Sequence, residues 1–179
     1  MYNQRICKKP GGGSGPPRGE DGCTMTRTSA REIAVHLVFQ QAFSGDGAQA
    51  LLERELTLEV FADRRGEEPL YADFPDQAQR DYICQLVRGV ERYRQELDGR
   101  IERYARGWRV ARIDRVAVSV LRVAIYEILH LPQVPDKVAI NEAVEIAKKY
   151  LDTDVVGFVN GILGSLVREE RPQEPAGKG

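Results

Sequence analysis

The sequence predicts an all-α protein, a compact bundle of six or seven helices. No segment alternates apolar and polar residues for long, which is the pattern of a half-buried strand. Instead, apolar residues recur at steps of three and four through the centre of the chain, over more than about four turns of one helix face. The residues of this central stripe are Ile113, Val116, Ala117, Val120, Leu121, Ala124, Ile125, Ile128 and Leu129. The connections between predicted helices are mostly short, as in helical bundles.

The first two helices are predicted between residues 29 and 62. Ser29 and Glu32 have the spacing of a capping box, in which the hydroxyl accepts from a first-turn amide and the carboxylate reaches back. The turn at residues 44–47, Ser-Gly-Asp-Gly, ends this helix. A second helix is expected from about Ala48 to Ala62. Residues 63–75 are polar and contain prolines, so a loop is expected there.

The other helices follow from the same apolar spacing. Asp76 is expected to cap a helical stretch that continues to Tyr104, with a break near Gly89 or Tyr93. Three further helices are expected over residues 113–129, 137–150 and 155–166.

The two ends of the chain differ in composition from its middle. Residues 1–25 are expected to be a disordered Gly/Pro-rich extension, residues 26–170 the helical domain and residues 171–179 a flexible tail. Met25, just before the helical part, is a candidate translation start. Residues 1–30 hold five basic and two acidic groups, so their charge is +3 and the rest carries −4 of the net −1. A helical domain with this net negative charge is expected to bind nucleic acid only through a local basic patch.

Several classes of protein are disfavoured by what the sequence contains. Three cysteines far apart do not resemble a disulfide framework or a zinc site, and they favour a reducing cytoplasm. No apolar run reaches the roughly 20 residues of a membrane helix, and no signal peptide is recognised. His36 and His130 stand alone within helices, and Glu142 and Glu145 fit a solvated face better than a carboxylate pair. We therefore expect no catalytic residue, no metal and no cofactor.

Basic residues gather at two places. Arg27 and Arg31 stand at the start of the first helix, where exposed amides and the positive helix end favour phosphate. A second group leads into the central helix: Arg106, Arg109, Arg112 and Arg115. Together they suit a single-stranded nucleic acid, with Trp108 stacking a base. Surface solubility for the arginines and a core position for Trp108 are the alternatives.

Four segments resemble the NusB family of bacterial transcription antitermination factors. Residues 121–129, LRVAIYEIL, resemble the family's "LRxAxYEL" helix, and residues 134–148, VPDKVAINEAVEIAK, resemble "xPxxVAINEAVELAK". Residues 157–163, GFVNGIL, are similar to "KFVNGVL", and residues 30–40, AREIAVHLVFQ, to "ARexAvqxLYq". The order and spacing of these motifs agree from about residue 27 to residue 168.

The resemblance implies two roughly perpendicular three-helix subdomains and a factor that acts without enzymatic chemistry. It implies binding of boxA-type single-stranded RNA from ribosomal RNA transcripts, together with the small-subunit ribosomal protein NusE. The pair would join the RNA polymerase antitermination complex and promote read-through of terminators. The implied RNA-binding residues are Arg27, Arg31, Phe158 and Asn160. The implied NusE-side residues are Phe39, Asp114 and Glu142. Glu127 and Glu142 fit equally well as internal struts that pair with arginines such as Arg122.

The sequence also departs from the family pattern. Arginines before the first helix are fewer than usual, Gly157 stands where lysine is common, and the loop at residues 63–75 is longer. Gly161 and Asn160 suit a packing glycine and a capping asparagine as well as an RNA contact. Two alternative functions stay open. One is a helical adaptor that binds proteins only, and the other is a docking domain related to RNA cytosine methyltransferases, for which the chain has little room. A homodimer is also left open.

Overall fold

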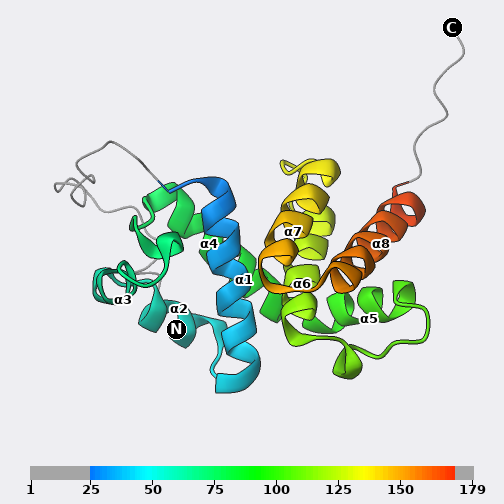
Figure 1. Cartoon of the computed structure of the whole chain (residues 1–179), viewed down its shortest axis with the longest axis horizontal. Helices are drawn as coiled ribbons and strands as arrows, with labels where there is room; N and C mark the ends of the chain where they lie inside the picture. The colour runs from blue at the N-terminus through cyan, green and yellow to red at the C-terminus, as the bar shows by residue number, and fades with distance from the viewer. Residues whose placement is uncertain (1–24, 172–179) are drawn as a thin grey trace, which may run out of the picture. The chain divides into compact units, whose positions relative to one another are not determined.

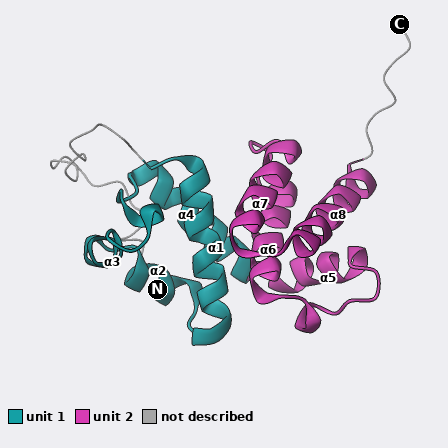
Figure 2. Cartoon of the chain, viewed as in Figure 1, with its two compact units in different colours: residues 1–91 teal, residues 92–179 magenta. Residues whose placement is uncertain are grey.

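The computed structural model describes residues 25–171, and within them every regular element is a helix (Figure 1). This confirms the all-α prediction. The chain divides into two compact units, one up to Glu91 and one from Arg92 onward (Figure 2). The disordered extension and flexible tail predicted from the sequence lie almost wholly outside the described range. No helix within the range is long and apolar enough to cross a membrane.

The part of the first unit that the structure describes, from residue 25 onward, contains four α-helices and one short 3₁₀ turn. Its elements are α1 (Arg27–Ser44), α2 (Ala48–Glu55), α3 (Leu58–Arg64), η1 (Pro69–Tyr71) and α4 (Gln77–Arg92), whose last residue reaches the next unit. Its largest buried side chains, all under 2% exposed, are Phe61, Ile33, Leu37, Leu51, Leu52, Ile83 and Leu86. Met25 is 6% exposed, so the first residue described already belongs to this core.

The first helix begins earlier than predicted. Thr26, not Ser29, is its N-cap: the Ser29 amide donates to Thr26 Oγ1 at 3.0 Å, and the Ala30 amide donates to the Thr26 carbonyl at 2.9 Å. The expected capping box is therefore wrong by one turn. Thr26 offers a hydroxyl as Ser29 does, and a helix that begins after Thr26 is one turn longer. Gly45, with φ of +69°, ends the helix in the left-handed region that suits glycine.

The helix predicted from Ala48 to Ala62 is two helices. It stops at Glu55, and Thr57 caps α3 by accepting a hydrogen bond from the Val60 amide at 3.3 Å. The loop expected at residues 63–75 contains η1, whose Tyr71 is buried. The ring of Phe61 meets Tyr71 and Phe74 edge-on, with centroids 5.0 and 5.1 Å apart. These aromatic contacts tie the segment to α3.

The second unit is built around α6 (Arg115–His130), which packs against the other three α-helices described up to residue 171 (Figure 1). These are α5 (Arg94–Tyr104), α7 (Asp136–Tyr150) and α8 (Thr153–Glu170); the 3₁₀ turn η2 (Val110–Arg112) precedes α6. Twelve residues of α6 are buried, as its long apolar stripe predicts. The expected helix break falls at Tyr93 and not at Gly89.

Polar groups inside each unit are paired across helices. In the second unit, Arg122 donates to both oxygens of Asp98 at 2.8 and 2.9 Å. The arginine of the predicted strut therefore pairs with an aspartate of α5, while Glu127 is fully buried within α6. In the first unit, Glu91 accepts hydrogen bonds from Gln41 at 2.8 Å and from the Ala48 amide at 2.7 Å. Glu91 thus supplies the cap that Gly47 cannot give to α2.

Candidate nucleic-acid interface

The amino-terminal end of α1 presents one arginine to solvent and covers another. Arg27 is exposed, and its guanidinium carbon lies 3.9 Å from the centroid of the buried Tyr82 ring. This cation–π contact orients a charged group at the positive amino-terminal end of α1. Arg31 is only 3% exposed and lies 5.6 Å from the same ring. Its assignment to an RNA surface stays a prediction, and its burial argues for a structural role instead.

The first half of α8 carries the segment GFVNGIL on its surface. Val159 is fully buried and continues the core stripe, whereas Phe158 is half-buried and Asn160 is exposed. A Cβ added at Gly157 or Gly161 would meet nothing within 4 Å. Neither glycine is therefore required by packing, and the α8 backbone is open to a partner at both positions.

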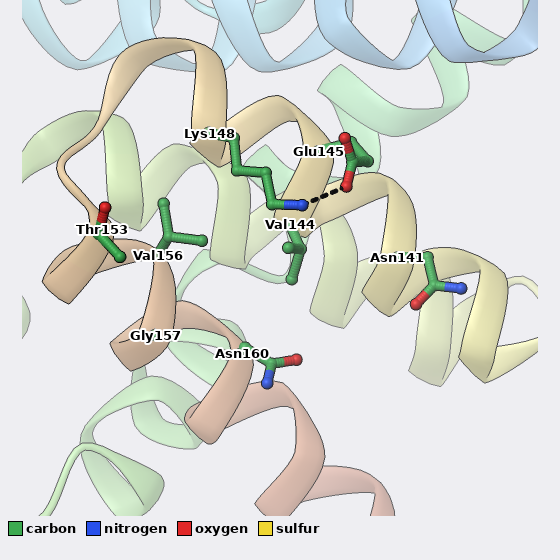
Figure 3. Close-up of a pocket in the computed structure, with 8 residues that line it drawn as sticks. All are labelled: Asn141, Val144, Glu145, Lys148, Thr153, Val156, Gly157 and Asn160. Atoms are coloured by element: carbon green, nitrogen blue, oxygen red, sulfur yellow. Dashed lines mark hydrogen bonds and ion pairs between the residues drawn. The ribbon is translucent and has the colours of Figure 1, made fainter.

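An open groove of about 420 Å³ runs between α7 and α8 (Figure 3). The residues that line it are Asn141, Val144, Glu145, Lys148, Thr153, Val156, Gly157 and Asn160. Asn141 and Asn160 stand on its two sides, and each carboxamide can donate and accept hydrogen bonds. Lys148 is 2.6 Å from Glu145, an exposed ion pair that a phosphate can displace at little cost. The groove therefore offers polar, reversible contacts beside the apolar side chains of Val144 and Val156.

The segment between α5 and α6 brings an aromatic ring to α8. Trp108 is 54% exposed, so it is not the core residue that a lone tryptophan often is. Its ring meets Phe158 edge-on, with centroids 6.4 Å apart. Arg106, Arg109 and Arg112 of the same segment are exposed. The loop that carries three arginines of the second basic group thus contacts the motif on α8 through Trp108.

The residues assigned to the NusE side occupy three separate positions. In the first unit, Phe39 is half-buried against Phe43, with ring centroids 4.9 Å apart, and Phe43 is 58% exposed. In the second unit, the exposed Asp114 caps α6: its Oδ1 accepts from the Val116 and Ala117 amides at 2.8 and 3.1 Å. Glu142 is half-buried on α7. Asp114 therefore has a structural task, and partner contact by all three residues stays a prediction.

His130 and the carboxylate of Glu55 lie in packed surroundings. His130 stacks on both Tyr93 and Tyr126, with ring centroids 4.1 and 5.1 Å away, as a structural histidine would. Burial alone would raise the pKa of Glu55, but hydrogen bonds from Arg54 and Gln40 and the charge of Arg64 outweigh it and lower the pKa. Among residues 25–171, no group of three His, Cys, Asp or Glu side chains could hold a metal ion.

Sequence reasoning missed one feature in each unit. Tyr82 supports Arg27, but its position was hidden among the apolar residues of α4. The groove was not predicted from the sequence, because its two sides, on α7 and α8, are brought together only by the turn at residues 151–152. Asn141 and Asn160 were visible in their two motifs, and the available signal was an uncharged amide that can donate and accept hydrogen bonds in each.

These features define an all-helical binding protein, in which the recognised motifs supply core stripes, a helix cap and exposed polar or aromatic groups. Residues 28–168 match the model of the NusB family. The transcription antitermination protein NusB of Symbiobacterium thermophilum is 42% identical over 145 residues, covering 80% of this chain and 90% of that protein. The protein of the same name from Acetivibrio thermocellus is 38% identical over 144 residues, with the same two coverages. The chain belongs to the NusB family.

Solved structures agree with this assignment. T. maritima NusB superimposes with a TM-score of 0.62 at 27% sequence identity, covering 82% of this chain and 94% of that one. A crystal structure of antitermination factors NusB and NusE in complex with dsRNA gives a TM-score of 0.65 at 22% identity, over 80% of this chain and 96% of the other. At that identity the second likeness concerns the fold alone.

Proposed function

We propose that this protein is a cytoplasmic transcription antitermination factor. It binds boxA-type single-stranded RNA of ribosomal RNA transcripts together with NusE, and the complex promotes read-through by RNA polymerase. Membership of the NusB family carries the proposal, supported by a relative 42% identical that is named as a transcription antitermination protein. The activity is binding, and no reaction is assigned to any residue.

The RNA side of the proposal draws on both units, each considered separately. In the first unit, Arg27 and the first-turn amides of α1 are suited to a phosphate. In the second unit, the half-buried Phe158 offers a ring to a base, and the exposed Asn160 offers both a donor and an acceptor to a base edge. Single-stranded RNA has unstacked bases that such groups can reach.

The protein side of the proposal depends on charge. Outside its first thirty residues the chain carries a net −4, so it cannot hold RNA by bulk attraction. A basic ribosomal partner would supply the missing positive charge and be attracted to Asp114 and Glu142. The Phe39–Phe43 pair adds apolar area of the kind that partners bury. RNA affinity is therefore expected to rise when NusE is present.

A titration of labelled boxA-type RNA, alone and with NusE, tests the proposal. Arg27→Ala is expected to weaken binding and to lower the salt slope by about 1, since one phosphate contact is lost. Arg65→Ala is the matched control, because Arg65 is also an exposed arginine of the first unit but lies at the end of α3. A duplex of the same sequence shows whether the unpaired form is preferred.

Two results would count against the proposal. An RNA affinity that NusE does not increase would refute the cooperative mechanism. An unchanged yield of read-through transcripts when the protein is added to a transcription reaction with a boxA-containing template would refute the antitermination role. Retained NusE binding with no RNA binding at all would instead identify a protein-only adaptor.

A further inference from the structure

Trp108 is a large aromatic residue that the fold leaves at the surface. Its side chain is 54% exposed, and it is the only tryptophan in the sequence. Tryptophan combines a large rigid aromatic surface with one polar N–H group, and it is enriched at binding interfaces for that reason. Edge-on contact with Phe158 fixes the indole ring while leaving much of it open. The two rings are called the Trp108–Phe158 pair below.

The backbone before Trp108 is shaped to present it. After α5 ends, Arg106 has φ of +41° and Gly107 has φ of +92°. A left-handed conformation is natural for glycine but costs an arginine free energy, so the turn is maintained by its surroundings. The Val110 amide helps to fix the segment by donating to Glu102 of α5 at 3.1 Å. The loop is therefore a defined structure that holds the indole against α8.

The charge around the pair selects an anionic partner. Residues 105–113 contain three arginines and no acidic residue. Arg109 approaches Glu102 at 3.7 Å, but its side chain is 79% exposed, and such a surface pair contributes little. In the described part of the chain, Arg106 and Arg112 are exposed and form no ion pair. A basic protein such as a ribosomal partner would be repelled here, whereas an RNA strand would be attracted.

The surface of α8 next to Phe158 has room for a polynucleotide. Gly157 and Gly161, the positions before and three after Phe158, carry no side chain and face open space. Asn160 lies between them in the sequence and also lines the groove toward α7 (Figure 3). An RNA strand that contacts Asn160 therefore has the Trp108–Phe158 pair within the same neighbourhood of the second unit.

We propose that the Trp108–Phe158 pair stacks a nucleobase of the bound RNA. The arginines at positions 106, 109 and 112 then contact the phosphates adjoining that base, as in other single-strand sites that combine aromatic rings with a basic groove. The proposal deepens the proposed function and rests on it, because it adds Trp108 and its loop to the surface that holds RNA. It assigns the tryptophan a direct RNA contact.

The fluorescence of the single tryptophan reports this contact directly. Titration of the full chain with an unlabelled boxA-type oligoribonucleotide, with NusE present, is expected to quench Trp108 and to protect it from iodide. In parallel, the anisotropy of labelled RNA gives the affinity. Trp108→Ala is expected to weaken binding by about 5- to 100-fold, and Trp108→Phe, which keeps a ring, by less than about 3-fold. Arg109→Ala with Arg112→Ala is expected to lower the salt slope by about 2.

A matched variant and a modified RNA sharpen the test. Leu58→Ala removes another apolar side chain, 55% exposed, from the first unit and is expected to leave affinity unchanged. In a series of RNAs that each lack one base, one RNA is expected to bind the unaltered protein as weakly as the complete RNA binds Trp108→Ala. The Trp108→Ala change should not weaken the binding of that RNA further, because both changes remove the same stack. Circular dichroism of each variant verifies that the helices are retained.

The outcomes separate this proposal from the proposed function. RNA that binds with unchanged Trp108 fluorescence, and with equal affinity for the Trp108→Ala protein, would overturn the stacking proposal and leave the proposed function standing. A Trp108→Ala variant that loses NusE but not RNA would also overturn it, because the surface would then be a protein contact. If RNA fails to bind the unaltered chain even when NusE is present, both the stacking proposal and the proposed function are refuted.

Discussion

The ion pair between Arg122 and Asp98 is expected to be a main source of stability in the second unit. Arg122 donates from Nε and Nη2 to the two carboxylate oxygens at 2.8 and 2.9 Å. The arginine side chain is 10% exposed and the aspartate 28%. Breaking a fully buried pair costs about 3–5 kcal/mol. Because water still reaches Asp98, we expect Arg122→Met to lower the free energy of unfolding by about 2–3 kcal/mol.

Urea unfolding followed by far-UV circular dichroism measures this change. For a chain of this size the loss corresponds to a fall in melting temperature of about 4–12 °C. Adding Asp98→Leu to Arg122→Met removes both charges, and the double-mutant cycle is expected to give a coupling energy of about 1.5–2 kcal/mol. Lys148→Ala is the control, since its pair with Glu145 is exposed on both sides and contributes about 0.5 kcal/mol or less. A cost for Arg122→Met below about 0.5 kcal/mol would refute the reasoning.

Three further predictions concern other parts of the fold. Phe61→Ala removes a buried ring that contacts Tyr71 and Phe74, and calorimetry is expected to show a loss of about 3–5 kcal/mol; a loss under 1 kcal/mol would mean that residues 63–75 pack independently. Asp114→Ala deletes the cap of α6 and is expected to cost about 1 kcal/mol in urea unfolding, whereas Asp114→Asn, which keeps an acceptor, should cost less. Glu55 has a lowered pKa in the folded state, so its stabilisation is present above its ordinary pKa and is lost as the pH falls through the folded value. Melting temperatures between pH 7 and 3 should therefore decline less in Glu55→Gln than in the unaltered protein, and parallel curves would contradict this.

The sequence predicted those elements that local pattern determines. The stripe of α6 is long and has no glycine or proline, so its existence and burial followed from spacing alone, although the helix begins at Arg115 and not at Ile113. Asp76 was expected as a cap, and its Oδ1 accepts from the Gln79 amide at 2.9 Å. The split between α2 and α3 was hidden because Leu56 continues the apolar stripe through the break. Thr57, a good N-cap residue, was the signal available there.

The candidate site was harder to predict, because it depends on contacts between distant residues. Arg31 shares a helix face with Ala34 and Val38, which are both fully buried, so its own burial could have been inferred from helical spacing. The bond between Arg122 and Asp98 joins residues 24 positions apart, and no local pattern indicates it. The meeting of Trp108 with Phe158 is a contact of the same kind. Motifs identified the α8 segment, but only the fold brought the tryptophan to it.

The carboxylate of Glu91 has a consequence for how the chain is assembled. Helix α2 has eight residues, too few to be stable alone, and its first turn relies on an acceptor 43 residues later. During synthesis α2 is made, and emerges from the ribosome, 43 residues ahead of that acceptor. Its first turn is therefore secured only when the end of α4 arrives, and a fragment cut before residue 91 would lose that anchor.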